Sequence, residues 1–322
     1  MAMTLAQMKV GMSDKIAAQI VDIFLRESEI LQAMPFDNCV AQGGVGSTLT
    51  YGYIRKVLPA VAAFRAINAE YTASEATVEK ASVDLKIMGA KFAIDRVLND
   101  AAGQWNNIAY QFEEAVKAVV SAFNYNMING DVSTSTNGFD GLAEICKDNS
   151  QVVSGSSIDL SSASAISTNA GAFYDALMGI LADTNGNAIL VNSTMKQKIQ
   201  SVARVLGYKT ESEEAFGKRV TKIDGVPIID MGNHYTVSSS TVTATPIVPA
   251  GSIFAVRFDA TDGVCGVTLQ GDKGVKVYRP DFNQPGAVKN GEVELVANIA
   301  VKNAKAAKQL KDVKLTASST NS

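Results

Sequence analysis

The segment from residue 48 to residue 95 constrains the fold more than any other. Apolar residues recur at every second position in residues 49–53 and again in residues 83–87, which predicts two strands. Beyond Gly89 the apolar phase moves by one residue to Phe92 and Ile94, a slip typical of a β-bulge. A connection of roughly 20 residues joins the two strands, and an isolated hairpin of this kind is marginal in water. The segment therefore needs a partner outside itself.

The connection between these strands is itself apolar. Four large side chains lie in a stretch with little around it to cover them: Leu58, Val61, Phe64 and Ile67. On a free monomer such a patch would invite aggregation.

A long stripe of apolar residues at helical spacing follows, from Gln104 to Gly130. Its members include Trp105, Ile108, Phe112, Val116 and Phe123. At ~1.5 Å per residue this helix would be close to 40 Å long. We expect its apolar face to pack on a sheet and its polar side to stay wet or to contact a neighbour.

Helices and strands are interleaved in the rest of the chain. An N-terminal helix is predicted from Ser13 to Pro35. A helix over 170–183 leads through an Asn-Gly turn into the apolar strand 188–191, and Asn192 can cap the helix after it. Further strands are predicted at "GVPIID", "SIFAVRF", "GVTLQ", "GVKVYR" and "GEVELVANIAV". The fold class is therefore α+β.

Composition excludes several classes of protein. The net charge of −3 leaves no broad basic field for nucleic acid. Three widely spaced cysteines, Cys39, Cys146 and Cys265, form neither a disulfide framework nor a C-x-x-C site. The chain contains no run long enough to span a membrane and begins without a secretory signal. We expect a protein made and kept in a cytosol.

The motifs that would indicate catalysis or ligand binding fail on inspection. "GGVGSTLT" lacks the lysine of a phosphate loop and has the wrong flanking elements. "DTNGN" has Ala188 and Thr194 where a calcium loop needs Gly and Glu, so it is interpreted as a turn. His234 is the single histidine and has no evident catalytic partner. Lysines spaced by three from Lys302 to Lys314 are interpreted as a solvated surface. We expect no enzyme, no cofactor and no metal.

The order of these parts resembles the Hong Kong 97-type major capsid protein of tailed bacteriophages. The matching strings, in chain order, are "GFDGLAEI", "AILVNSTMKQKI", "GVPIIDMG", "SIFAVRF" and "GVCGVTLQG". Each string alone is weak, but their order from about residue 13 to about residue 314 makes the resemblance specific.

The resemblance implies a division of the chain. It would have an N-terminal arm at 1–46, an extended loop (E-loop) at 47–95, a peripheral domain with a spine helix at 96–155 and 252–322, and an axial domain at 156–251. It also implies self-assembly into pentamers and hexamers of an icosahedral virion capsid, built in the host bacterial cytoplasm around double-stranded DNA held without sequence specificity. Portal and decoration proteins would be further partners, and no membrane would be involved.

In such a shell the apolar connection would be the tip of the E-loop, lying across a neighbouring subunit. Burying its four large side chains there would stabilise the contact by roughly 6 to 12 kcal/mol before the ordering costs of association. Two alternatives stay open: an encapsulin-type nanocompartment shell, and, from another class, a soluble enzyme or ligand-binding protein that uses the 156–251 lobe.

Two features of the family are not carried over directly. Some members begin with a long scaffolding segment, whereas about 46 residues precede the E-loop here, which implies a separate scaffolding protein or assembly without one. Some members crosslink an E-loop lysine to an asparagine of the peripheral domain. Lys80 and Lys86 lie in the first element, and Asn283, Asn290 and Asn298 in the second, but no pair is assigned.

Overall fold

The computed structural model describes residues 29–39, 48–96, 107–208, 211–215, 218–238, 241–269 and 275–316. Most of the predicted N-terminal helix, the "GGVGST" segment up to Ser47, and Trp105 lie outside the described residues. The described end of that helix is α2 (Glu29–Ala33), which leads into strand β1 (Phe36–Cys39).

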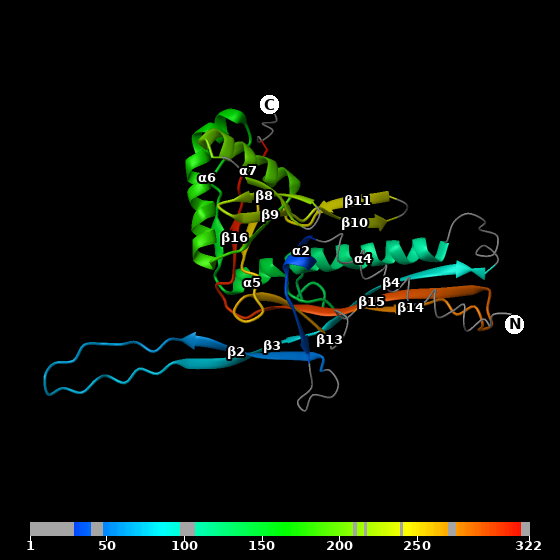
Figure 1. Cartoon of the computed structure of the whole chain (residues 1–322), viewed down its shortest axis with the longest axis horizontal. Helices are drawn as coiled ribbons and strands as arrows, with labels where there is room; N and C mark the ends of the chain where they lie inside the picture. The colour runs from blue at the N-terminus through cyan, green and yellow to red at the C-terminus, as the bar shows by residue number, and fades with distance from the viewer. Residues whose placement is uncertain are drawn as a thin grey trace.

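A thin hairpin projects from the body of the molecule (Figure 1). It consists of β2 (Thr50–Leu58) and β3 (Thr77–Asp84), which pair antiparallel from Thr50 opposite Asp84 to Leu58 opposite Thr77. We call β2, β3 and their connection the extended hairpin, and residues 59–76 the loop tip.

The second predicted strand is in fact two strands, and the break falls at Leu85. Before Leu85 the chain forms β3, which pairs with β2. After Leu85 it forms β4 (Lys86–Asp95), which pairs with β15 (Val288–Val301) in the body. The register of β4 against β15 runs through Gly89 without a shift, so the predicted β-bulge at Gly89 is wrong. A Cβ at Gly89 would lie 2.8 Å from the carbonyl oxygen of Val293. The glycine therefore permits a close approach of two backbones rather than a bulge.

Strand β15 is the centre of a five-stranded sheet. On one edge it pairs with β4, and on the other with β13 (Val264–Leu269) and β14 (Val275–Tyr278), while β1 extends the sheet beyond β13 in parallel. Helix α4 (Asn107–Asn129) contacts β4 and β15. It has 23 residues and is therefore about 34 Å long. This is the described part of the predicted spine helix.

The second layer is a seven-stranded sheet that carries α6 (Ala163–Thr184) and α7 (Ser193–Leu206) (Figure 1). Its strands, in spatial order, are β5 (Val152–Ser154), β16 (Ala307–Lys311), β12 (Ile253–Val256), β6 (Ala188–Val191), β9 (Val226–Asp230), β8 (Lys218–Ile223) and β7 (Glu211–Ala215). Strands from both sides of the predicted limits at 156 and 252 thus share one sheet. The division into peripheral and axial domains remains a prediction.

Local capping fixes the ends of the two helices on this sheet. Helix α6 ends at Asn185, which adopts a left-handed conformation with φ of 49°, so the "DTNGN" segment is a helix-to-strand turn. The Asn192 side chain accepts a hydrogen bond of 2.8 Å from the Met195 N–H at the start of α7, and donates one of 3.1 Å to the Val248 carbonyl. Both ends follow the sequence prediction, because the Asn-Gly turn and the Asn192 cap each act within a few residues.

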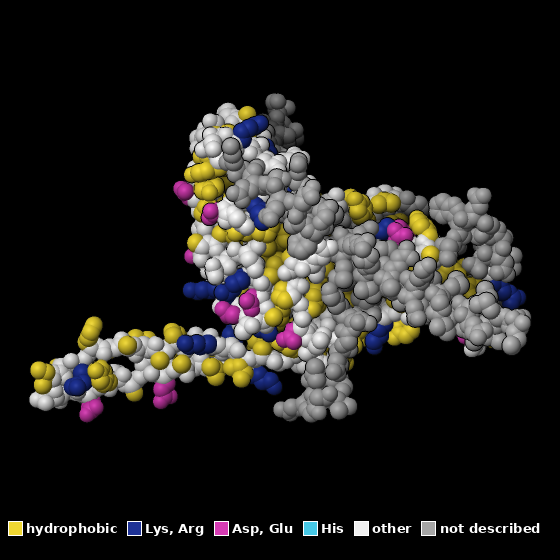
Figure 2. All heavy atoms as spheres, in the orientation of Figure 1, with side chains coloured by type: hydrophobic (Ala, Val, Ile, Leu, Met, Phe, Trp, Pro, Cys, Tyr) yellow, Lys and Arg dark blue, Asp and Glu magenta, His cyan; other side chains and the backbone are white. Residues whose placement is uncertain are grey.

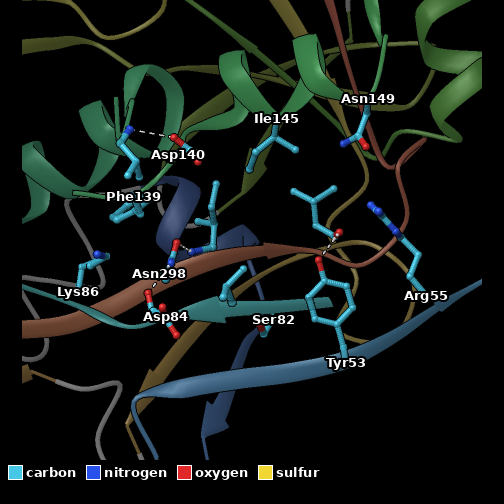
Figure 3. A pocket seen from close by; sticks show the side chains of 14 residues that line it. Tyr53, Arg55, Ser82, Asp84, Lys86, Phe139, Asp140, Ile145, Asn149 and Asn298 are labelled. Atoms are coloured by element: carbon cyan, nitrogen blue, oxygen red, sulfur yellow. Dashed lines mark hydrogen bonds between the residues drawn. The ribbon is translucent and has the colours of Figure 1, made fainter. Parts of the chain in front are cut away.

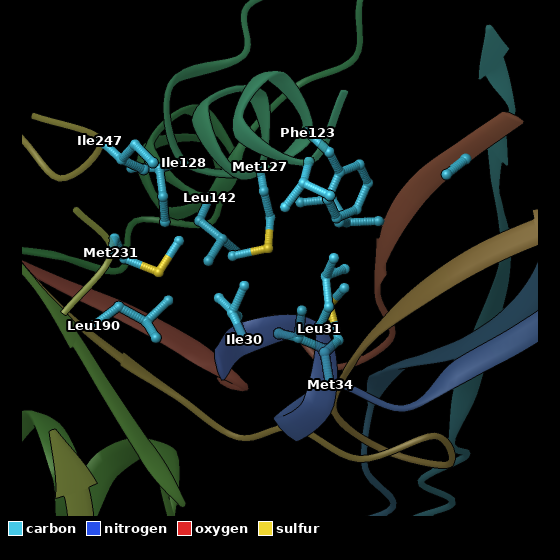
Figure 4. Packing of buried hydrophobic residues seen from close by; sticks show 14 of the residues in the cluster. Ile30, Leu31, Met34, Phe123, Met127, Ile128, Leu142, Leu190, Met231 and Ile247 are labelled. Atoms are coloured by element: carbon cyan, nitrogen blue, oxygen red, sulfur yellow. The ribbon is translucent and has the colours of Figure 1, made fainter. Parts of the chain in front are cut away.

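The main core joins α4 to α2, to α5 (Leu142–Asp148) and to both sheets. Phe112, Val116 and Phe123 of the predicted stripe are buried, and Ile108 is partly buried at its edge. Figure 4 shows Ile30 and Leu31 of α2, and Met34 just after it, pointing toward Phe123 and Met127 of α4 and toward Leu142 of α5. The Phe92 and Phe112 rings meet edge to face with centroids 4.7 Å apart, which fixes β4 against the helix.

Candidate subunit interface at the extended hairpin

The loop tip exposes large apolar side chains. Phe64 is fully exposed, Ile67 is 91% exposed and Val61 is more than half exposed. Leu58, at the adjoining end of β2, is also more than half exposed. Sequence reasoning missed four further exposed apolar side chains on the hairpin, namely Ile54, Val57, Tyr71 and Val78. The even-numbered phase of β2 could have indicated Ile54, because Tyr51 and Tyr53 occupy the inward phase. Figure 2 shows hydrophobic side chains along the whole extended hairpin.

The loop tip has little internal support. No residue from 59 to 76, all of them described, belongs to a strand. The Val61 N–H donates to Ser74 Oγ at 3.0 Å, and the Ala69 N–H donates to the Ala66 carbonyl at 3.2 Å. The Arg65 guanidinium lies 5.2 Å from the centroid of the Tyr71 ring. The tip therefore presents backbone donors and acceptors, together with apolar side chains, to whatever lies next to it.

The base of the hairpin, in contrast, is firmly attached to the five-stranded sheet. Tyr53 Oη donates to the Val301 carbonyl at 3.0 Å, and Asn298 Nδ2 donates to the Asp84 carbonyl at 2.7 Å. Below these bonds lies a small separate core of Cys39, Leu85, Cys265, Val267, Val296 and Ala300, with Tyr51 and Tyr53 packed against it. The hairpin is thus directed away from the body by its base, while its tip is left without cover.

A charged cluster completes the attachment. Tyr51 Oη donates to Asp37 Oδ2 at 2.5 Å, and Lys302 Nζ lies 3.4 Å from the same oxygen. Burial raises the pKa of the Asp37 carboxyl, but hydrogen bonds from Tyr51 and from the Asn38 N–H, together with Lys302, lower the pKa more, so it lies below its usual value. Burial and the bond to Asp37 raise the pKa of Tyr51. At neutral pH the carboxylate is therefore ionised and the phenol remains a donor.

Between the hairpin base and the body lies a cavity of about 320 Å³ (Figure 3). Tyr53, Arg55 and Asp84 line it from the hairpin, and Asp140 and Ile145 line it from the body. Among the described residues, no group of three or more His, Cys, Asp or Glu side chains could hold a metal ion. The cavity lies at the junction of hairpin and body, and the described residues that line it include no histidine or cysteine.

The single histidine is engaged in packing elsewhere. His234 Nδ1 lies 3.0 Å from Ser121 Oγ on α4, and its ring stacks on Tyr125 at 4.8 Å between centroids. Burial lowers the pKa of His234, which favours the neutral ring at neutral pH.

No helix within the described part of the chain is long and apolar enough to cross a membrane.

The family model of the SU10 major capsid protein matches residues 15–263. The chain belongs to the SU10 major capsid protein family. It is a phage major capsid protein, and the resemblance seen in the sequence is confirmed. No curated protein sequence matches the chain.

Solved structures share the fold of this capsid protein at low sequence identity. The capsid of a native GTA particle matches with a TM-score of 0.59 and 12% identity, over 92% of this chain and 90% of that one. A structure from Microbacterium phage Oxtober96 gives 0.58 and 9%, over 88% and 90%. The SrpI encapsulin of Synechococcus elongatus PCC 7942 gives 0.58 and 15%, over 91% and 90%. The fold is the predicted α+β Hong Kong 97-like capsid fold.

The family and the fold indicate a structural protein rather than an enzyme. They support self-assembly of this capsid protein into a shell and a location in the virion capsid.

Proposed function

We propose that this capsid protein assembles into pentamers and hexamers through its loop tip, which covers a neighbouring copy. The observation that supports this proposal is the contrast between the hairpin base, which is hydrogen-bonded to the five-stranded sheet, and the uncovered apolar tip. Contacts between two different patches on successive copies are the kind that close into rings. The predicted limits of the N-terminal arm, E-loop, peripheral domain and axial domain belong to this proposal.

The size of the assembled species tests this proposal. We expect native mass spectrometry of the purified protein to show species of five and six times the mass of the 34.0 kDa chain, and negative-stain microscopy to show closed shells. The physical reason is that burial of the tip stabilises each contact in a ring. A monodisperse monomer over a wide range of protein and salt concentrations would contradict the proposal.

We further propose that the shell encloses double-stranded DNA without gripping it. The net charge of −3 supports this, because a wall without a strong basic field lets packaged DNA slide. A scaffolding protein, a portal and decoration proteins are proposed as additional partners, and the host bacterial cytoplasm as the place of assembly.

The purified subunit is therefore expected not to bind duplex DNA at submicromolar concentration in about 150 mM salt, as measured by fluorescence anisotropy. Tight binding under these conditions would show that a local basic surface outweighs the net charge. The contents of the particle distinguish this function from the alternative one. The similarity to the SrpI encapsulin makes a nanocompartment shell the second candidate, and particles isolated from the native host would then contain a protein cargo in place of DNA.

A further inference from the structure

A second exposed apolar surface lies on a hairpin that the sequence interpretation left without a role. Strands β10 (Asn233–Ser238) and β11 (Thr241–Pro246) pair antiparallel and lie over α4 (Figure 1). The hairpin contacts α4 through His234, whose ring reaches both Ser121 and Tyr125. One face of the hairpin is thereby directed toward the spine helix.

The alternation of side chains then places the apolar residues on the opposite, outer face. Thr236 and Ser238 share the face of His234, whereas Tyr235 and Val237 share the other face. The register puts Val242 directly opposite Val237. Tyr235, Val237 and Val242 are each more than half exposed. The face that carries His234 is thus directed toward α4, although Thr236 and Ser238 on it are exposed. The apolar side chains of Tyr235, Val237 and Val242 lie on the other face.

The hairpin also lacks the features that normally prevent strand edges from pairing. Residues 231–256 contain no Asp, Glu, Lys or Arg. Among the described strands, β10 and β11 pair only with each other, so each has an open outer edge. Native proteins usually protect such edges with charges, bulges or covering segments. The outer face of this uncharged, β-branched hairpin is therefore a candidate docking surface.

The loop tip of another copy has the chemistry and the position to be that partner. Its backbone lacks strand pairing, and its apolar side chains are uncovered. The loop tip lies at one end of the long axis of the molecule, while the β10–β11 hairpin lies over α4 toward the other end (Figure 1). One copy cannot close this contact on itself, whereas successive copies placed head to tail can.

We propose that the loop tip of one copy docks on the outer face of the β10–β11 hairpin of the next copy. Apolar contacts with Tyr235, Val237 and Val242 would cover the tip, and the open strand edges would accept its free backbone groups. This proposal rests on the proposed function and deepens it by naming the surface that receives the tip.

Site-specific photo-crosslinking tests the location of this contact. An Ile67→Cys variant is labelled with a benzophenone maleimide and co-assembled with an excess of ¹⁵N-labelled wild-type chain. The native thiols compete poorly, since all three are buried and burial raises the pKa of Cys146 to about 12 and of Cys265 to about 11. After illumination and trypsin digestion, we expect the probe on the ¹⁵N peptide of residues 223–257, which contains the hairpin. Dissociated subunits serve as the control and should lose this product.

The possible results separate this inference from the proposed function. Attachment to a different ¹⁵N peptide would overturn the docking site but leave the loop tip as a contact between copies. Attachment confined to the labelled copy, or the absence of any product, would overturn both.

A pair of neighbouring substitutions gives an independent readout. Val237→Asp places a charge on the outer face, and Ser238→Asp places the same charge on the opposite face of the same strand. Both side chains are exposed, so both free subunits should keep their circular dichroism spectra. We expect Val237→Asp to abolish particles in light scattering and Ser238→Asp to retain them. Particle formation by Val237→Asp would contradict the proposed docking site.

Discussion

Replacing Phe64 by Asp is expected to abolish shell assembly while the subunit stays soluble and folded. Phe64 is fully exposed in the isolated chain, so a carboxylate there would simply face water. At a contact between copies the same charge would be buried without a partner, which costs several kcal/mol. That cost would recur at every copy in the shell. Light scattering measures the loss of particles, and circular dichroism checks the fold.

Phe64→Leu is the matched control for this variant, since it keeps an apolar side chain at the same position and should still give particles. Two results would contradict the role of the tip. Normal assembly of Phe64→Asp would show that the tip is not a buried contact. If the substitution unfolded the free subunit instead, Phe64 would belong to a monomer core.

The second large effect is expected in the spine helix, where Phe123→Ala should destabilise the subunit itself. Phe123 is completely buried, with its ring centroid 6.4 Å from that of Phe36 and 6.0 Å from that of Phe139. Removing a buried phenylalanine typically lowers the free energy of unfolding by about 3–5 kcal/mol, because contacts are lost and a cavity remains. Urea denaturation of the soluble Phe64→Asp subunit, with and without Phe123→Ala, measures this change without interference from assembly.

Lys117→Ala on the outer side of the same helix is the control. Lys117 forms ion pairs with Glu113 and Glu114 one turn away, and its loss should change the unfolding free energy by only about 0.2–0.5 kcal/mol. Equal effects of Phe123→Ala and Lys117→Ala would show that α4 is not the centre of the core.

Several parts of this capsid protein were predictable because their causes are local. The apolar stripe of α4 repeats every three or four residues, and a single helix turns all of these side chains to one face. Asn192 caps α7 through a bond to an N–H three residues away. The period of two marks β2, the last residues of β3 and the start of β4. The exposed apolar connection was also visible, because the surrounding sequence contains nothing to cover it.

The tertiary structure decided what depends on distant partners. Whether residues 83–95 form one strand or two is determined at Leu85, where the chain leaves β2 and joins β15, a strand some 200 positions later in the numbering. The reason for a glycine at position 89 is clear only when the Val293 backbone is known to lie beside it. Likewise, the outer face of the β10–β11 hairpin became identifiable only when His234 was found against α4. Periodicity shows that a strand has two faces, but only the packing partner determines which of them is covered.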